Sequence, residues 1–264
     1  EFGSTIQQIE NDGFEVARRV EMLLSSDSAV GVTKSTGLGM LGFADAYDSL
    51  QPDIVLLLGD RFELLAAASA ALFAVIPIAH IHGGEVTSGA FDDAIRHSIT
   101  KMAHLHFTST EQYQNRVIQL GENPANVFNV GAPGIDHIHR LKLLERKELE
   151  EKLGLTLESN SLLITFHPAT LEPGTARRDF EVLLRALDQL ENVSLVFTKA
   201  NADTEGRSIN EMIDGYVESR SNAIAHTSLG QLLYLSTMKE VQGVVGNSSS
   251  GIIEAPSLEV GTVN

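Results

Sequence analysis

A run of three serines between glycines, GNSSSG at residues 246–251, carries polar groups at a position where a ligand could bind. It follows the apolar run VQGVV and precedes IIEAPSL, a pattern typical of a strand, a tight turn and the start of a helix. Hydroxyls and backbone N–H groups at such a turn bind anions. The alternative is a plain polar turn, because serine-rich turns are common and no Gly-Lys-Ser/Thr of a P-loop follows.

If the turn binds a phosphate, the candidate ligands to it are consecutive in the sequence: Asn247, Ser248, Ser249, Ser250 and Gly251. Glu254 follows one helical turn after the glycine. A carboxylate just behind a phosphate site can accept hydrogen bonds from ribose hydroxyls, as the acidic residue of dinucleotide-binding folds does. The spacing therefore predicts that the serines hold phosphate and that Glu254 holds the sugar.

Asp60 lies in GDRFE (59–63), directly after the apolar run DIVLLL. The alternative to a catalytic role is a helix N-cap, because aspartate accepts hydrogen bonds from the first N–H groups of a helix. A catalytic role requires a second polar cluster that faces Asp60. The neighbouring Arg61 is a candidate substrate-binding residue.

The segment HIHGGE (80–85) supplies such a cluster. His80 and His82 alternate along a predicted strand, so both side chains are expected on the same face. We expect His80 to be buried and hydrogen-bonded, and His82, nearer the strand end, to meet a ligand. Two glycines then lead to Glu85, a candidate acid/base group. A metal site is the alternative, but nothing else in the sequence has metal-ligand spacing, and we predict no metal.

The segment FDDAIRHS (91–98) places Asp92 and Asp93 at a helix start, where the helix dipole favours anions. Arg96 and His97 lie within reach for i,i+4 ion pairs, which is the structural alternative. A carboxylate held by a helix N-terminus and an arginine is a candidate acid/base group. We therefore take Asp92 as catalytic, and Arg96 and His97 as substrate-binding candidates.

These clusters require a scaffold that brings strand ends together, and short apolar runs do alternate with longer amphipathic segments. The predicted strands are 53–59, 76–82, 105–110, 127–131, 161–167, 193–199 and 241–247. The predicted helices are 63–74, 92–103, 111–121, 144–154, 178–190 and 230–238. This alternation predicts an α/β fold with parallel sheets covered by helices on both faces.

The Gly/Pro segment GAPGID (131–136) is read as a turn between two Rossmann-like domains, residues 1–134 and 135–264. In such folds ligands bind beyond the carboxyl ends of the strands, often in the cleft between domains. The candidate clusters follow predicted strands, as this rule requires. His167 does so as well: it precedes Pro168 at a strand end and is a candidate to meet a leaving phosphate, although a lone histidine is usually structural.

The composition narrows the class of protein. A net charge of −16 over 264 residues argues against nucleic-acid binding but permits a small phosphorylated ligand. No run of 18 apolar residues and no signal-peptide pattern occurs, so we predict neither membrane insertion nor secretion. The chain has no cysteine, which fits the reducing cytoplasm. No cofactor is predicted.

Taken together, the segments resemble one known family, the hydrolysing UDP-N-acetylglucosamine 2-epimerases of bacterial sialic-acid synthesis and its relatives. The segments that occur there in the same order are GDRFE, HIHGGE, DDAIRHSITKMAHLHFTSTE, RVIQLGE, VGAPGID, FHP, NADT (201–204) and GNSSSGIIEAPS. The resemblance covers essentially the whole chain and is most specific between Asp60 and Glu111. It implies the GT-B architecture, with a nucleotide sugar between two Rossmann-like domains.

The resemblance also implies a reaction: UDP-N-acetylglucosamine and water give N-acetylmannosamine and UDP through a 2-acetamidoglucal. Carboxylates do the acid/base work in the family, and the matching positions here are Asp60 and Asp92. A third family carboxylate lies in a His-x-Glu-Gly-Gly motif; His82 stands at that position here, so its role is open. Glu85 matches a recurrent acidic position, and His167 matches a histidine near the diphosphate.

In the same comparison, Ser248 and Ser249 match diphosphate ligands and Glu254 a ribose ligand. Family members begin with a strand and a Gly-Thr-Arg-x-Asp-type turn and continue past VGTVN, so a chain shortened at both ends is expected. A homo-oligomer, either a dimer or a tetramer, is also expected. The alternatives are a related diacetamido sugar or GDP in place of UDP, a GT-B glycosyltransferase, and a nucleotide-sugar binder without activity.

Overall fold

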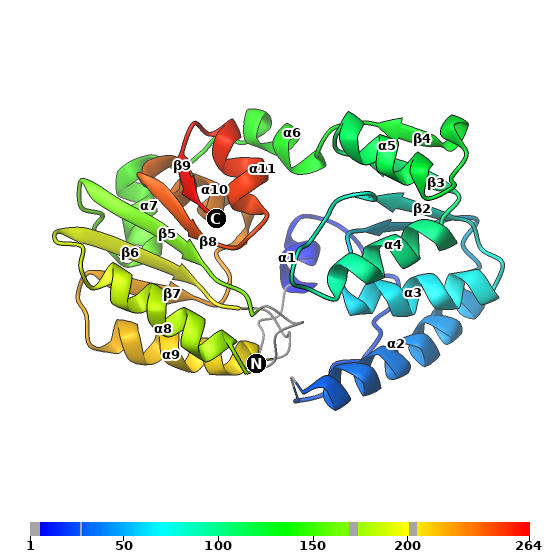
Figure 1. Ribbon diagram of the computed structural model, residues 1–264, viewed down its shortest axis with the longest axis horizontal. Coiled ribbons are helices and arrows are strands. Elements are labelled where there is room, and N and C mark those ends of the chain that lie inside the picture. Colours follow the sequence, from blue (N-terminus) through cyan, green and yellow to red (C-terminus); the bar gives the residue numbers. More distant parts are fainter. Residues whose placement is uncertain (1–5, 27, 169–173, 201–204) are drawn as a thin grey trace. The chain divides into compact units, whose positions relative to one another are not determined.

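The computed structural model describes residues 6–26, 28–168, 174–200 and 205–264 (Figure 1). They form two compact units. One unit is Val16–Pro133, and the other is Gly134–Asn264 together with the described part of the first fifteen residues. The short helix α1 (Ile6–Asn11) belongs to the second of these.

The unit Val16–Pro133 contains a sheet of four parallel strands in the order β1-β2-β3-β4. Its elements are α2 (Ala29–Leu50), β1 (Val55–Leu58), α3 (Phe62–Phe73), β2 (Ile78–Ile81), α4 (Asp92–Met102), β3 (Leu105–Thr108), α5 (Glu111–Gln119), the 3-10 turn η1 (Pro124–Asn126) and β4 (Val127–Asn129). Because the strands are parallel, all their carboxyl ends meet at one edge of the sheet. That edge carries Asp60 and His82.

Helices α2, α3 and α4 lie together along the sheet of this unit (Figure 1). Close packing of α2 on α3 depends on small residues: a Cβ on Gly39 would lie 3.0 Å from the Cβ of Ala66. The prediction that helices cover both faces of the sheets is only partly right for β1. Leu57 is buried, whereas Leu56 and Leu58 are 62% and 56% exposed, because the described helices cover only one face of β1.

The unit that ends at Asn264 contains a sheet of five parallel strands in the order β7-β6-β5-β8-β9. Its elements are α6 (Pro133–Arg140), α7 (Arg146–Leu153), β5 (Asn160–Thr165), α8 (Ala176–Leu187), β6 (Val193–Thr198), α9 (Gly206–Glu218), β7 (Ala223–His226), α10 (Gly230–Glu240), β8 (Gly243–Gly246), α11 (Ser250–Ser257) and β9 (Gly261–Val263).

Helices cover both faces of this five-stranded sheet (Figure 1). Successive residues of a strand point to opposite faces, so Leu163 joins a core with α7, α10 and α11. The next residue, Ile164, joins a second core with α8 and α9. The α/β class, the parallel sheets and every predicted strand and helix are therefore confirmed.

The structure also contains elements that the pattern did not predict, chiefly α2, α9 and β7. At the predicted Gly/Pro turn (131–136), Gly131 has a φ of +79°, but the following Pro133 begins helix α6. Proline suits the first turn of a helix because its missing N–H has no partner there. Residues 133–136 are therefore helical rather than a turn.

Candidate active site

Arg96, a buried residue of α4, lies at the centre of one polar cluster. One terminal nitrogen of its guanidinium donates to the carboxylate of Asp60 and, at 2.9 Å, to the hydroxyl of Thr87. The other donates to the backbone carbonyl of His82 at 2.9 Å and to Oε2 of Glu85 at 3.2 Å. We call Asp60, His82, Glu85, Thr87 and Arg96 the Arg96 cluster. It brings together four of the predicted site residues.

Asp60 reaches the cluster because of the turn that follows β1. Gly59 has a φ of +96°, which glycine adopts readily, and α3 begins two residues after Asp60. The alternative role as helix N-cap is wrong: Arg61 occupies that position and makes no side-chain capping bond. Arg61 instead contacts Glu63 at 3.3 Å, and the Asp60 carboxylate turns toward Arg96.

His82 and Glu85 contact each other directly, with 2.5 Å between Nδ1 and Oε1. The same oxygen accepts a hydrogen bond from the hydroxyl of Ser109, 2.7 Å away. Burial raises the pKa of the Glu85 carboxyl, but the hydrogen bonds from His82 and Ser109 and the charges of His82 and Arg96 outweigh it. The net effect holds the pKa of Glu85 below its usual value.

His80 is buried and hydrogen-bonded, as predicted, and it connects two strand ends. Nε2 lies 2.8 Å from the carbonyl oxygen of Gly59, and Nδ1 lies 3.2 Å from the hydroxyl of Thr100. Burial lowers the pKa of His80 to about 4, so the ring is neutral at neutral pH. The prediction that His80 and His82 share a strand face fails, because β2 ends at Ile81 and His82 has a φ of +65°.

At the start of α4, one of the i,i+4 ion pairs that formed the structural alternative is present. Asp93 lies 3.7 Å from His97 in an i,i+4 pair, and its Oδ1 accepts a hydrogen bond from the backbone of Thr87 at 3.0 Å. Arg96 contacts the carboxylates of Asp60 and Glu85. Asp92 is half-buried and is the first residue of the helix.

A second polar site, the strand-end pocket, lies in the unit that ends at Asn264 and has a volume of about 420 Å³. It is lined by Thr165, His167, Thr198, Lys199, Thr227, Ser228, Leu229, Gly230, Gln231, Tyr234, Ser248 and Ser250. These residues end or follow β5, β6, β7 and β8 or lie in the first turns of the next helix. The pocket therefore lies at the carboxyl ends of the strands, where ligands bind in such folds.

The serine turn forms one wall of this pocket. Gly246 has a φ of +140°, and a Cβ there would lie 1.8 Å from the carbonyl oxygen of Thr165, so only glycine fits. Asn247 holds the turn to β5, because its side chain exchanges two 2.7 Å hydrogen bonds with the backbone of His167. Ser248 and Ser250 line the pocket, whereas Ser249 is exposed and is not among the lining residues.

The backbone N–H groups of this turn, which were expected to bind an anion, already have protein partners at three positions. The N–H of Asn247 donates to the carbonyl of Thr165 at 3.1 Å. The N–H of Ser250 donates to the hydroxyl of Ser248 at 3.3 Å, and the N–H of Gly251 donates to the Ser248 carbonyl at 3.1 Å. The turn closes on itself before α11 begins. The hydroxyl groups of Ser248 and Ser250 are therefore the stronger candidates to contact an anion.

Glu254 has the feature expected of a ligand-binding carboxylate. Its Oε2 atom is buried and has no hydrogen-bond partner among the described residues. Leaving a buried carboxylate oxygen without a partner is costly, so such an atom calls for an explanation. A Cβ on Gly134 would lie 3.2 Å from the other carboxylate oxygen, so the space beside Glu254 depends on that glycine.

Nine of the twelve described lining residues of the strand-end pocket were not predicted, and Lys199 and Tyr234 are the two of them with ionisable side chains. Lys199 contacts Asp214 at 2.7 Å and is the only lysine or arginine among the described residues that line the pocket. It ends the predicted strand 193–199, which is the signal that could have found it. Burial raises the pKa of Tyr234, while hydrogen bonds with Ser250 and Thr165 oppose the rise.

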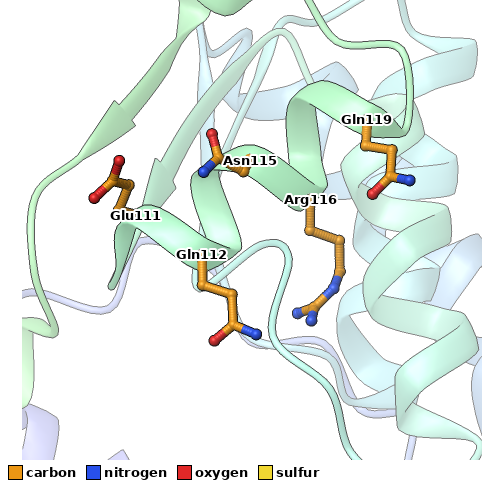
Figure 2. Close-up of a pocket in the computed structure, with 5 residues that line it drawn as sticks. All are labelled: Glu111, Gln112, Asn115, Arg116 and Gln119. Atoms are coloured by element: carbon orange, nitrogen blue, oxygen red, sulfur yellow. The ribbon is translucent and has the colours of Figure 1, made fainter.

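A second pocket, of about 510 Å³, lies along α5, and Figure 2 shows that its lining side chains come from this one helix. The lining residues are Glu111, Gln112, Asn115, Arg116 and Gln119. None of them is a predicted site residue. Arg116 joins this pocket to the loop of the Arg96 cluster, because its guanidinium donates to the carbonyl of Gly84.

In the described ranges, no three or more His, Asp or Glu side chains are grouped to hold a metal ion. Among the described helices, none has the length and apolarity to cross a membrane. The motif NADT (201–204) lies outside the described residues.

Comparison with protein families gives one match that covers the whole chain. The family described as UDP-N-acetylglucosamine 2-epimerase matches residues 1–264. A Campylobacter jejuni protein named GDP/UDP-N,N'-diacetylbacillosamine 2-epimerase (hydrolyzing) is 44% identical over 100% of this chain and 69% of its own length. An Escherichia coli protein named polysialic acid biosynthesis protein P7 is 39% identical, with 100% of this chain and 67% of its own length covered.

A Legionella pneumophila protein named UDP-N,N'-diacetylbacillosamine 2-epimerase (hydrolyzing) is 35% identical over 100% of this chain and 69% of its own length. The chain therefore spans about two thirds of these relatives. Among solved structures, UDP-GlcNAc 2-epimerase from Neisseria meningitidis bound to UDP-GlcNAc matches with a TM-score of 0.80 at 20% identity, covering 98% of this chain and 70% of that one. This likeness confirms the GT-B-like fold class.

Proposed function

Because the chain belongs to the UDP-N-acetylglucosamine 2-epimerase family, we propose that it inverts C2 of a UDP-linked 2-acetamido sugar and releases UDP by hydrolysis. The family match over residues 1–264 carries this proposal. Two sites built at strand ends support it: the strand-end pocket for the nucleotide and the Arg96 cluster for acid/base chemistry. UDP-GlcNAc is the first candidate substrate.

The nucleotide part of the substrate is assigned to the strand-end pocket. The hydroxyls of Ser248 and Ser250 and the ammonium of Lys199 supply donors to the diphosphate. The unpartnered Oε2 of Glu254 accepts from the ribose hydroxyls. His167, which also lines the pocket, is the candidate to meet the leaving phosphate.

The chemical steps are assigned to the unit Val16–Pro133, which contains Asp60 and Asp92. A C2 hydrogen beside an amide is only weakly acidic, so the base and the departing UDP must be positioned together. Removal of the C2 proton leaves the bonding pair to form the C1–C2 double bond, and the C1–O bond breaks with its pair on UDP. Water then adds at C1, and a proton returns to C2 from the opposite face. Asp60 and Asp92 are the proposed acid/base carboxylates.

A related sugar is a second candidate substrate, which a specific observation favours. The relatives at 44% and 35% identity are both named as 2-epimerases of N,N'-diacetylbacillosamine, and one name includes GDP. An additional acetamido group on the sugar changes neither the acidity at C2 nor the leaving group. The same acid/base set therefore serves both substrates.

Proton NMR in deuterated water tests the proposal. We expect the protein, with UDP-GlcNAc or UDP-diacetylbacillosamine and no acceptor, to give free UDP and a released sugar that carries deuterium at C2. The sugar that is turned over faster is the substrate. The same measurement with the GDP-linked sugars shows which nucleotide the protein uses. Product formation only after an acceptor sugar is added would instead identify a glycosyltransferase. UDP binding in calorimetry without any turnover would identify a binding protein.

We further propose a cytoplasmic homo-oligomer, a dimer or a tetramer, that supplies N-acetylmannosamine or a related sugar for sialic-acid-type synthesis. The relative named for polysialic acid biosynthesis, 39% identical, supports the pathway. The absence of cysteine from all 264 residues agrees with a reducing compartment. Light scattering of the purified protein measures the number of subunits.

A further inference from the structure

The contact between His82 and Glu85 leaves one nitrogen of the imidazole available. Nδ1 of His82 lies 2.5 Å from Oε1 of Glu85, so this nitrogen is engaged by the carboxylate. No hydrogen bond between Nε2 and a described residue is present. The His82 side chain is 15% exposed, which limits the ring to a few orientations. An imidazole bound at Nδ1 and open at Nε2 has the arrangement of a histidine that transfers a proton.

Glu85 is held at both of its oxygens, and this fixes its protonation state. Ser109 donates to Oε1 at 2.7 Å, and Arg96 donates to Oε2 at 3.2 Å. Burial alone raises the pKa of Glu85, but these hydrogen bonds and charges lower it below its usual value overall. The carboxylate is therefore ionised near neutral pH, so the 2.5 Å contact requires the proton to lie on Nδ1. In the neutral imidazole the lone pair then lies on Nε2.

The backbone of His82 is also held on both sides. Its N–H donates to the carbonyl of Phe107 at 2.9 Å, and its carbonyl accepts from Arg96 at 2.9 Å. With a φ of +65°, His82 is in the left-handed region that few non-glycine residues adopt. Residues kept in that region by surrounding structure are concentrated at functional sites. The following Gly84 packs so tightly that a Cβ would lie 2.4 Å from the carbonyl oxygen of Tyr113.

From these contacts we infer that His82 and Glu85 form a carboxylate–imidazole pair in which Nε2 of His82 takes the C2 proton of the sugar. Glu85 is then a positioning residue rather than the base itself. This inference rests on the proposed function, since it assigns one step of that reaction. In the step, the C2–H bond breaks, its electron pair forms the C1–C2 double bond, and the proton joins Nε2. The C1–O pair leaves with UDP.

Glu85 is the weaker choice of base because both of its oxygens already accept hydrogen bonds. A carboxylate stabilised in its ionised form has little tendency to take a further proton. The groups that face His82 are the Glu85 carboxylate, the Arg96 guanidinium with its partner Asp60, and the neutral ring of His80. The imidazole protonated in this step is balanced by the carboxylate next to it.

Kinetics of four variants as a function of pH test the pair in the complete protein. We expect His82→Gln to lower kcat and C2 deuterium exchange by at least about 10²-fold with little change in UDP affinity, as for loss of a general base. Glu85→Gln should lower kcat and move the acidic limb of the kcat/KM profile to lower pH, because a neutral amide does not stabilise the protonated ring. Glu85→Asp should restore part of the activity.

Glu122→Gln is the matched control. Glu122 accepts from a second histidine of the same unit, with 3.3 Å between its Oε2 and Nε2 of His106, but lies outside the Arg96 cluster. It should leave the pH profile unchanged. Near-wild-type turnover of His82→Gln, or a Glu85→Gln profile identical to that of the wild type, would overturn the pair while leaving the epimerase function intact.

Nitrogen-15 NMR of the imidazole rings tests the pair without turnover. The wild type should show His82 protonated at Nδ1 and bare at Nε2, and Glu85→Gln should abolish that preference. A ring protonated at Nε2 overturns the inference even in an active enzyme. A wild-type protein that releases no deuterated sugar from any of the candidate substrates overturns the proposed function, and the role of His82 with it.

Discussion

Arg96 determines where two of the candidate carboxylates lie. Its guanidinium contacts Asp60 and Glu85, and the three side chains are 7%, 19% and 14% exposed. Two partly buried carboxylates that contact the same guanidinium would repel each other without the cation between them. Removing one member of such a buried set is strongly destabilising, because an uncompensated charge remains. Variants of this cluster therefore need a stability measurement beside the activity measurement.

Glu254→Gln tests the ribose contact. The buried Oε2 of Glu254 has no partner among the described residues, so we expect it to accept hydrogen bonds from the ribose. The variant should weaken UDP binding by about 1.5–3 kcal/mol, the value of a hydrogen bond to a charged group. It should also discriminate less between UDP and its 2′-deoxy analogue in calorimetry. Glu259→Gln, an exposed residue just after α11, is the control. A variant that keeps the full preference for UDP would place the ribose contact elsewhere.

Single residues also show the limit of reasoning from sequence. The sequence identified Asp60, His82 and Glu85 as candidate site residues, but it did not predict which residues they contact. Asp60 and Arg96 are 36 positions apart, and only the parallel order β1-β2 brings them together. The contact between His82 and Glu85 follows from a left-handed φ that no periodic pattern announces.

At the scale of elements, apolar runs predicted the strands of the five-stranded sheet reliably. Helices cover both faces of this sheet, and its strands are therefore almost continuously apolar. Helix α2 (Ala29–Leu50) was missed for a physical reason. It carries four glycines, at positions 31, 37, 39 and 42, which are poor helix formers. Its stability comes from packing on α3, where Gly39 lets the two helices approach.

The serine turn between β8 and α11 is the element whose role can be tested most directly. Ser248 and Ser250 line the strand-end pocket, so replacing both with alanine should weaken UDP binding by about 1–3 kcal/mol. The fold should survive, because neither hydroxyl belongs to a buried core. The sequence favoured Ser249 as well, but Ser249 is exposed, and Ser249→Ala should cost less. Calorimetry of the folded variants gives the affinities, and an unchanged affinity in the double variant would remove the turn from the site.

For the whole molecule, the two candidate sites belong to different units of the chain. The Arg96 cluster lies in Val16–Pro133, and the strand-end pocket lies in Gly134–Asn264. The net charge of −16 gives an anionic nucleotide no general attraction, so its binding depends on local donors. Substitutions should therefore separate into two groups: changes in one unit should reduce turnover, and changes in the other should reduce affinity for UDP.

Asp60→Asn and Asp92→Asn test this separation. Each should lower turnover by at least about 10²-fold, since general acid/base groups contribute about 10²–10⁴-fold. UDP affinity should change little, because every residue that lines the pocket lies in the other unit. If one carboxylate acts only in the later hydration, its variant should release the glycal intermediate into solution, where NMR detects it. Thermal unfolding must show that Asp60→Asn remains folded, because that change leaves Arg96 with one carboxylate fewer. Near-wild-type turnover in both folded variants would contradict the assignment of these two carboxylates.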